Sequence, residues 1–395
     1  MPLNGASMSS GHSSEDRRYM KMALRMAQRG QGHVEPNPMV GAVLVRNGKI
    51  IAKGWHRQFG GPHAEIDALS QARARATARS QTAARGATLY VSLEPCCHTG
   101  KTGPCTEAII SAGIERVVIA MKDPNPLVAG KGIARLRRAG IQVDIGILEG
   151  DARALNRPFI KWITTHQPYV IAKWAQTLDG CIADRHGKSR WISSPPSREF
   201  VHQLSGRMDG VITGIGTALA DDPLLTARPQ KVTARSRTAT RIIMDSQCHL
   251  PLNSKLVKSA GAVPTMVMHR KALAGAALRR RNELAAHGVQ CIGIPAEKTG
   301  GIDLAAALKE LGKRGLTNVH VEGGPKLIGA MLAKNLIDEG MVFIAPKIAG
   351  DLKARRAVEG MTLPSIQDAT ALTFSKVTTS GPDIMLRWRV EHEKR

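Results

Sequence analysis

This chain of 395 residues is organised around two runs, His63-Ala64-Glu65 and Pro95-Cys96-Cys97-His98-Thr99-Gly100-Lys101-Thr102-Gly103-Pro104-Cys105. Imidazole nitrogen and thiolate sulfur are ligands that Zn²⁺ prefers, and three protein ligands leave the fourth tetrahedral position for water. His63, Cys96 and Cys105 therefore form a candidate zinc site. Any one of them alone would fit an ordinary buried side chain, whereas their combination favours a metal centre.

The spacing leaves an alternative for the third ligand, because Cys97 lies in the same loop. We favour Cys105, since the side chains of adjacent residues diverge on an extended chain, so Cys97 would point away from a metal that Cys96 binds. Pro104 suits a first helical turn, and the helix dipole there favours a thiolate on Cys105. Cys97 stays the weaker alternative.

Glu65 follows the candidate ligand His63 by two residues. A carboxylate beside a metal, but not bound to it, can carry a proton from water to a departing amine. The pattern His-x-Glu followed by Pro-Cys is typical of zinc-dependent deaminases, although their usual spacing is Pro-Cys-x-x-Cys and the loop here is longer. The two runs therefore predict a hydrolytic deaminase with Glu65 as its catalytic residue.

The first part of the chain alternates between strand and helix patterns. We expect strands at 40–45, 50–52, 87–93, 116–121 and 141–147, and helices at 64–78, 105–112 and 131–139, after an amphipathic helix that Gly30 ends. Such alternation predicts a layered α/β domain with its ligand at the strand ends. We expect a polar, disordered leader at 1–16 and the deaminase domain at 17–150. Residues 151–167 have a helical and then polar pattern, which predicts either a linker or the closing helix of that domain.

A second α/β pattern occupies residues 168–395. Strands are expected at 169–174, 209–213, 240–245, 264–268, 289–293 and 318–321, helices at 196–205, 272–287, 303–314 and 325–335, antiparallel strands at 338–345 and 371–390, and a mobile loop at 229–240. Gly214-Ile215-Gly216 and Gly323-Gly324-Pro325 follow two of these strands, but neither contains a complete Gly-x-Gly-x-x-Gly fingerprint. A dinucleotide bound here would not occupy a standard Rossmann site.

The composition separates several classes of protein. The net charge of +24 could indicate nucleic-acid binding, but aromatic residues make up only 3% and the charge forms no block. We favour a solvated basic surface that steers phosphorylated substrates, with no nucleic-acid partner. Six cysteines in a chain of this length indicate a metal site in a reducing, cytoplasmic compartment. No apolar run reaches membrane-spanning length, so no membrane partner is expected.

From about Asp16 onward, the chain resembles the bifunctional deaminase–reductases of bacterial riboflavin biosynthesis. The matching motifs are the two runs above and Pro36-Asn37-Pro38-Met39-Val40-Gly41, Asp123-Pro124-Asn125-Pro126, Thr177-Leu178-Asp179-Gly180, Ala220-Asp221-Asp222-Pro223 and Val321-Glu322-Gly323-Gly324-Pro325. The resemblance implies an N-terminal domain with the cytidine-deaminase-like three-layer α/β/α fold. It also implies a C-terminal α/β domain like dihydrofolate reductase, which accounts for NADPH binding without a Rossmann fingerprint.

The resemblance implies two consecutive reactions on phosphorylated pyrimidines. The 2-amino group of 2,5-diamino-6-(5-phosphoribosylamino)pyrimidin-4(3H)-one is hydrolysed at Zn²⁺, and NADPH then reduces the ribosyl group to ribityl. A homo-oligomer, either a dimer or a tetramer, is expected.

The resemblance also implies site residues. The deaminase substrate would contact Asn37, His98, Lys101, Asp123 and Asn125. The reductase substrate would contact Lys173, Ser189, Arg207, Leu225, Arg228 and Glu322. NADPH would contact Thr177, Trp191, Thr217, Asp221, Ser246 and Gly324.

One departure from the family bears on the second reaction. Relatives often carry an arginine for the substrate phosphate where this chain has Ser205. Arg207 or Arg198 would then replace that charge, or the reductase half would be impaired. The competing functions are a tRNA base deaminase, which leaves half the chain unexplained, and an inactive zinc-binding scaffold, which the intact Glu65 argues against.

Overall fold

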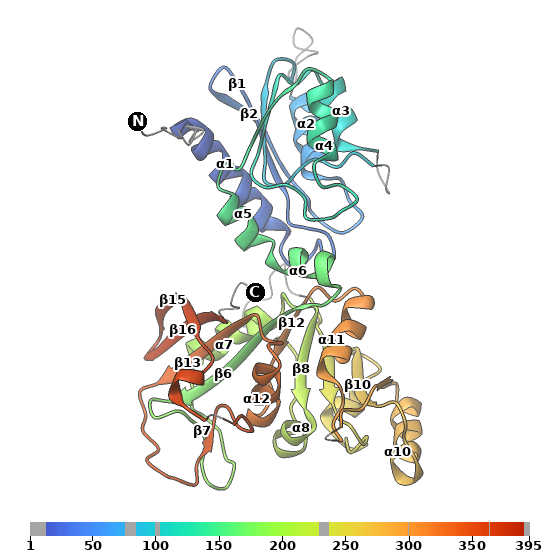
Figure 1. Cartoon of the computed structure of the whole chain (residues 1–395), viewed down its shortest axis with the longest axis vertical. Coiled ribbons are helices and arrows are strands. Elements are labelled where there is room, and N and C mark those ends of the chain that lie inside the picture. The colour runs from blue at the N-terminus through green and yellow to red at the C-terminus, as the bar shows by residue number, and fades with distance from the viewer. Residues whose placement is uncertain are drawn as a thin grey trace, which may run out of the picture. The chain divides into compact units, whose positions relative to one another are not determined.

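The computed structural model describes residues 13–75, 84–98, 103–228, 237–298, 300–362 and 364–390. The chain divides into two compact units, Met1–Thr164 and Thr165–Arg395 (Figure 1). Across these described ranges, none of the helices combines the length and the apolar character needed to cross a membrane.

The first unit contains a five-stranded sheet in the order β2-β1-β3-β4-β5. Its strands are β1 Gly41–Arg46, β2 Lys49–Trp55, β3 Thr88–Val91, β4 Arg116–Ile119 and β5 Gln142–Ile145. Its helices are α1 Ser14–Ala27, α2 Ala64–Ala74, α3 Cys105–Ser111, α4 Lys131–Arg138, α5 Glu149–Leu155 and α6 Arg157–Thr165, with a short 3-10 turn at Gln28–Gly30. β1 pairs antiparallel with β2 and β3, whereas β3, β4 and β5 are parallel.

Side chains that alternate along the strands build one core on each face of this sheet. Leu44, Leu89 and Val117 pack with residues of α2, α3 and α4 on one face. Val43 and Val118 pack with residues of α1 and α5 on the other (Figure 1). The expected three-layer α/β/α arrangement is confirmed.

The first helix begins earlier than the sequence suggested. α1 starts at Ser14, after the N-cap Ser13, so residues 14–16 belong to it and not to a disordered leader. Asp16 is buried and accepts hydrogen bonds from the Tyr90 hydroxyl, at 2.7 Å, and from two Arg116 nitrogens, at 2.9 and 3.1 Å. A polar N-terminal composition concealed the start of this helix, because its first turn buries a charge that two distant side chains satisfy.

The segment expected as a linker, 151–167, consists mostly of α5 and α6. Asn156, between the two helices, is buried, and its amide exchanges hydrogen bonds of 2.8 and 3.0 Å with the backbone N–H and C=O of Met39. Phe159 is also buried. These contacts hold the segment to the first unit, so of the two expected forms the closing helix is present and the linker is not.

The second unit contains a nine-stranded sheet in the order β11-β10-β9-β8-β12-β6-β13-β16-β15. Its strands are β6 Tyr169–Thr177, β8 Gly210–Gly214, β9 Thr240–Met244, β10 Thr265–Arg270, β11 Gln290–Ile294, β12 Asn318–Val321, β13 Glu339–Ala345, β15 Leu372–Ser380 and β16 Asp383–Val390. Pairings from β11 to β13 are parallel, and β16 pairs antiparallel with β13 and β15. β7 Cys181–Ala183 and β14 Arg355–Arg356 form a separate small ribbon.

Helices cover both faces of the large sheet. They are α7 Pro195–Ser205, α8 Ile215–Asp221, α9 Lys255–Lys258, α10 Gly275–Ala286, α11 Leu304–Lys313 and α12 Pro325–Ala333, and a 3-10 turn lies at Ile366–Asp368. α11 and α12 pack on the face that contains Val319 and Val321 of β12. Leu204 of α7 packs against Tyr169 and Ile171 of β6 on the opposite face.

Most expected strands and long helices are present, with shifted ends. The short helices α8 and α9 were not expected. α2 ends at Ala74, and the remainder of the helix expected at 64–78 runs into residues 76–83, outside the described ranges. The mobile loop expected at 229–240 likewise falls mostly on residues 229–236, which are not described, and β9 begins at Thr240.

Candidate active site

The three candidate zinc ligands converge from three elements of the first unit. His63 is the N-cap of α2, Cys96 follows β3, and Cys105 is the first residue of α3. Cys105 therefore lies at a helix N-terminus, as expected. His63 Nδ1 lies 3.2 Å from Cys105 Sγ and 3.5 Å from Cys96 Sγ. Zinc bond lengths in a tetrahedron place nitrogen and sulfur ligands roughly 3.6 Å apart, so this donor set fits the ion.

Cys96 has thiolate character in this arrangement. The hydrogen bond from Cys105 lowers the pKa of the Cys96 thiol, against the opposing effect of burial. The backbone N–H of Cys105 also donates to Cys96 Sγ, at 3.4 Å. Among the described residues, the group of metal-ligating atoms within 4.8 Å of one another comprises His63, Cys96 and Cys105, without Cys97.

Glu65 lies in the first turn of α2 and is almost wholly buried. α2 approaches β2 closely, because Gly54 has no side chain and a Cβ there would lie 2.3 Å from the Ala64 carbonyl oxygen. Burial raises the pKa of Glu65 to about 7, and the neighbouring Cys96 adds to this shift. A carboxyl group with such a pKa can both accept and release a proton near neutral pH.

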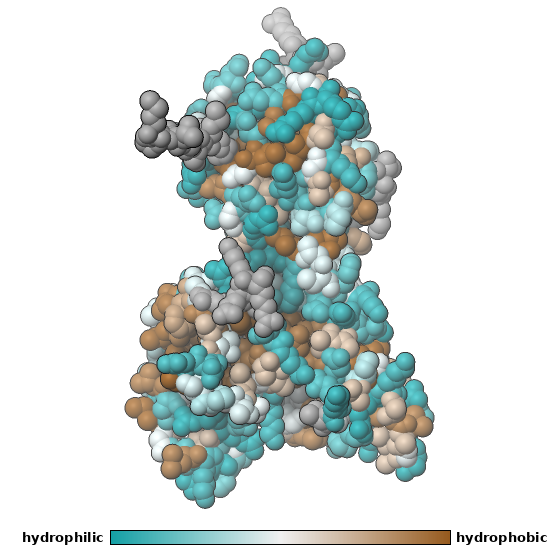
Figure 2. Space-filling model, viewed as in Figure 1, coloured by the Kyte–Doolittle hydropathy of each residue, from teal (hydrophilic) through white to brown (hydrophobic). Residues whose placement is uncertain are grey.

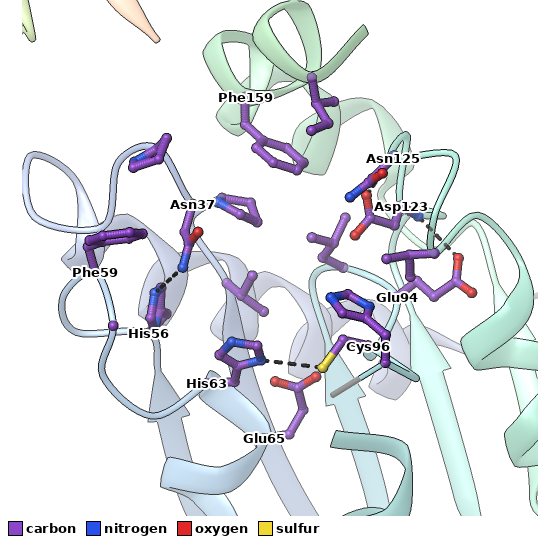
Figure 3. A pocket seen from close by; sticks show the side chains of 18 of the residues that line it. Asn37, His56, Phe59, His63, Glu65, Glu94, Cys96, Asp123, Asn125 and Phe159 are labelled. Atoms are coloured by element: carbon purple, nitrogen blue, oxygen red, sulfur yellow. Dashed lines mark hydrogen bonds between the residues drawn. The ribbon is translucent and has the colours of Figure 1, made fainter. Parts of the chain in front are cut away.

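A cavity of about 340 Å³ opens beside these residues (Figure 3). Seven of the residues predicted for the deaminase line it: Asn37, His63, Glu65, Cys96, His98, Asp123 and Asn125. Cys105 is fully buried, and Lys101 lies outside the described residues. The cavity is also lined by His56, Phe59, Phe159 and Trp162, which the sequence motifs did not indicate. The spacing of Phe159 and Trp162 on one face of α6 was a usable signal for two of them.

Asn37 is oriented by His56 (Figure 3). His56 Nδ1 lies 2.9 Å from the Pro62 carbonyl oxygen, which can only accept, so Nδ1 carries the hydrogen. Burial lowers the pKa of His56, which keeps the ring neutral. Its Nε2 therefore accepts a hydrogen bond from Asn37 Nδ2, at 3.1 Å, and the Asn37 carbonyl oxygen can accept from a ligand's N–H group.

Glu94 holds the loop that carries Asp123 and Asn125. Its buried carboxylate accepts from the backbone N–H groups of Asp123, Gly130 and Ile133, at 3.2, 2.9 and 3.1 Å. Burial raises the pKa of Asp123 to about 6. The cavity thus offers oxygen acceptors on both sides, which suits a ring bearing amino groups.

In the second unit, Lys173 of β6 and Glu322, directly after β12, approach each other. Lys173 Nζ lies 3.8 Å from Glu322 Oε1. Burial acts to raise the pKa of Glu322, but the positive charge of Lys173 and the contact with His320 outweigh it and hold that pKa well below its usual range. The structure therefore brings two predicted substrate residues together and keeps the carboxylate ionised.

The predicted NADPH residues lie around strand ends of the same unit. A Cβ on Gly324 would lie 2.9 Å from Thr217 Oγ1, so these two residues are neighbours. Thr177 donates to Asp179 at 2.5 Å, and the Asp221 carbonyl oxygen accepts from Arg190 at 3.4 Å. Trp191 is 63% exposed. The Ser246 carbonyl oxygen accepts a hydrogen bond from the Arg270 backbone N–H, at 3.2 Å.

The other predicted substrate residues occupy loops and helix ends. Ser205 is buried at the end of α7 and donates to the Val201 carbonyl oxygen at 2.9 Å. Arg207 follows this helix and is half-buried, whereas the Arg198 guanidinium lies 4.4 Å from the centre of the Trp191 ring. Ser189 precedes the Arg190–Trp191 pair, Leu225 packs partly against the α8–α9 core, and Arg228 lies in the loop after α8.

Comparisons with known proteins cover both units. Residues 13–121 match the model of the cytidine and deoxycytidylate deaminase zinc-binding region, and residues 168–386 match the RibD C-terminal domain. The riboflavin biosynthesis protein RibD of Aquifex aeolicus is 41% identical over 94% of this chain and 97% of its own length. The chain belongs to the RibD family.

Solved structures agree with this assignment. Acinetobacter baumannii RibD superposes with a TM-score of 0.83 at 36% identity, covering 96% of this chain and 99% of that one. A Thermotoga maritima protein described as a diaminohydroxyphosphoribosylaminopyrimidine deaminase/5-amino-6-(5-phosphoribosylamino)uracil reductase superposes with a TM-score of 0.81 at 34% identity, covering 95% and 99%. Like its family, the chain is a bifunctional deaminase and reductase of riboflavin biosynthesis, with zinc in the first domain and NADPH in the second. Full-length similarity accounts for the half of the chain that an RNA deaminase left unexplained.

Proposed function

We propose that this chain hydrolyses the 2-amino group of 2,5-diamino-6-(5-phosphoribosylamino)pyrimidin-4(3H)-one and then reduces the ribosyl group of the resulting uracil to ribityl with NADPH. The observation that carries the proposal is the cavity of the first unit, where the His63, Cys96 and Cys105 donor set meets a buried Glu65. The second unit, which matches the RibD C-terminal domain, supplies the reductase.

In the deaminase half, we assign His63, Cys96 and Cys105 as zinc ligands and Glu65 as the proton carrier. When bound, zinc lowers the pKa of water and so supplies hydroxide near neutral pH. Glu65 takes the proton from that water and delivers it to the nitrogen of the departing amine. Substrate-binding residues are Asn37, His98, Lys101, Asp123 and Asn125. Because His56 binds the amide nitrogen of Asn37, the carbonyl oxygen of Asn37 accepts from the pyrimidine.

In the reductase half, we assign Lys173, Ser189, Arg207, Leu225, Arg228 and Glu322 to the substrate. We assign Thr177, Trp191, Thr217, Asp221, Ser246 and Gly324 to NADPH. The ion pair of Lys173 and Glu322 supports the first group, and the proximity of Thr217 and Gly324 at the start of α12 supports the second. Arg207 is our replacement for the charge that Ser205 lacks, because Arg198 already stacks on Trp191.

We further infer that the protein forms a homo-oligomer through the β15 edge of the large sheet. β15 ends the sheet, and Phe374 and Val377 on it are 60% and 64% exposed. Apolar surface gathers over this part of the second unit in Figure 2. An unprotected apolar edge strand favours pairing with another chain.

The six free thiols support a reducing, cytoplasmic compartment.

The test is product analysis by mass. Purified protein is incubated with the diamino pyrimidine, with and without NADPH. We expect the uracil with its ribosyl group without NADPH and the ribityl product with it. Unchanged substrate in both samples, from zinc-loaded protein, would refute the proposed substrate.

A further inference from the structure

His320 is a fully buried histidine in the middle of the large sheet. It belongs to β12, between Val319 and Val321, which face the α11 and α12 core. Because side chains alternate along a strand, His320 faces the opposite side, where α7 packs. Glu322, two residues later, faces the same side. Apolar packing accounts for the two valines but not for an imidazole between them.

The polar neighbour of this imidazole is Glu322. His320 Nε2 lies 3.0 Å from Glu322 Oε1, within ion-pair distance, but neither Nε2 nor Nδ1 makes a hydrogen bond of good geometry with the residues that the structure describes. Lys173 Nζ lies 3.8 Å from the same carboxylate oxygen. A buried polar ring without hydrogen bonds is costly, so packing alone does not account for an imidazole here, and Glu322 is the polar group that its Nε2 faces.

The backbone of Glu322 is already fixed on both sides. Its N–H donates to the Ile212 carbonyl oxygen at 2.9 Å, and its C=O accepts from Thr213 Oγ1 at 3.0 Å. The side-chain torsions are the remaining freedom of Glu322, and His320 and Lys173 restrict them by holding one oxygen. The printed contacts of the Glu322 side chain among the described residues are all to Oε1, so Oε2 can accept from a hydroxyl group of the substrate.

We propose that His320 is a positioning residue of the reductase, whose Nε2 lies against Oε1 of Glu322 and keeps that carboxylate beside the Lys173 ammonium group. This inference rests on the proposed function, in which Glu322 and Lys173 contact the substrate. Partners that orient a functional side chain from behind typically change activity by roughly tenfold to a hundredfold when they are removed.

Two variants separate positioning from packing. His320→Leu removes the donor and keeps an apolar side chain in the core, whereas His320→Gln keeps an N–H donor near the place of Nε2. We expect His320→Leu to lower the reductase kcat by roughly tenfold or more and His320→Gln to retain most of it. NADPH affinity, measured by fluorescence, and deaminase activity should stay within about twofold of wild type in both variants, because substitutions affect sites with which they share no partner only slightly.

A double-mutant cycle with Glu322→Gln completes the test. If His320 acts through Glu322, His320→Leu has little further effect on kcat in the Glu322→Gln background. Fully multiplicative effects, a His320→Leu enzyme with wild-type kcat, or loss of NADPH binding in both His320 variants would each overturn the inference. Wild-type protein that oxidises no NADPH with the uracil substrate would instead refute the proposed reductase function, and this inference with it.

Discussion

Replacing Glu94 by glutamine tests how the deaminase loop is held. The Glu94 carboxylate accepts three backbone N–H groups, two on Oε2 and one on Oε1. Glutamine keeps one acceptor oxygen, so its amide group must face at least the Ile133 N–H and leave that buried donor unsatisfied. An unsatisfied buried donor costs about 1–3 kcal/mol, and the remaining bonds weaken because the acceptor is no longer charged. We expect a total loss of about 3 kcal/mol.

The assay is urea inactivation followed with both activities in the same sample. With a urea dependence of about 1–3 kcal/mol/M, a loss of 3 kcal/mol lowers the midpoint of deaminase inactivation by roughly 1–3 M. The reductase midpoint should not move, and the deaminase KM should rise more than kcat falls, because Asp123 and Asn125 lie in the loop.

Glu107→Gln is the matched control. Glu107 forms an exposed ion pair with Arg135 on the same unit, at 2.8 Å, and such surface pairs contribute little. It should leave the deaminase midpoint unchanged. A Glu94→Gln protein that behaves like this control, with wild-type midpoint and KM, would refute the role given to Glu94.

Three further predictions concern the metal, the pH dependence and the reductase. Cys96→Ser and Cys105→Ser should lose bound zinc on metal analysis, while Cys97→Ser retains it; the reverse pattern would move the ligand role to Cys97. Asp16→Asn should destabilise the first unit by about 1–2 kcal/mol at neutral pH. Burial acts to raise the pKa of Asp16, but the hydrogen bonds from Arg116 and then from Tyr90 outweigh it and lower that pKa to about 2. The stabilisation by ionised Asp16 is therefore present above pH 4 and is lost as the pH falls toward 2. A difference in unfolding free energy between wild type and variant that stays constant from pH 7 to pH 2 would contradict this role of Asp16. In steady-state kinetics, Arg228→Ala should raise the KM for the substrate more than the KM for NADPH. A raised KM for NADPH alone would mean that the substrate and cofactor sites were assigned the wrong way round.

The zinc and proton-transfer residues could be predicted from the sequence because they lie in short local patterns. His63 and Glu65 lie at the start of one helix, and Cys96 and Cys105 lie at the two ends of one loop. Their residue types and spacing are therefore enough to indicate the chemistry. The supporting residues gave no such signal. His56 acts through its contact with Asn37, and this partner is reached only when the chain folds back.

The element boundaries failed where tertiary contacts decide them. Asp16 looked like part of a polar leader, yet Arg116 and Tyr90, far along the chain, neutralise its burial. The pattern around Asn156 could not separate a linker from a closing helix, and the burial of Asn156 against Met39 decides for the helix.

The most direct test of the two-site account is Glu65→Gln protein assayed for both reactions in the presence of NADPH. The amide is nearly the same size as the carboxylate but cannot take a proton from water. We predict that the variant keeps its zinc, leaves the diamino pyrimidine unchanged and reduces the supplied phosphoribosylamino uracil at the wild-type rate. Ammonia release at a near-normal rate, or loss of reductase activity together with deaminase activity, would contradict the account.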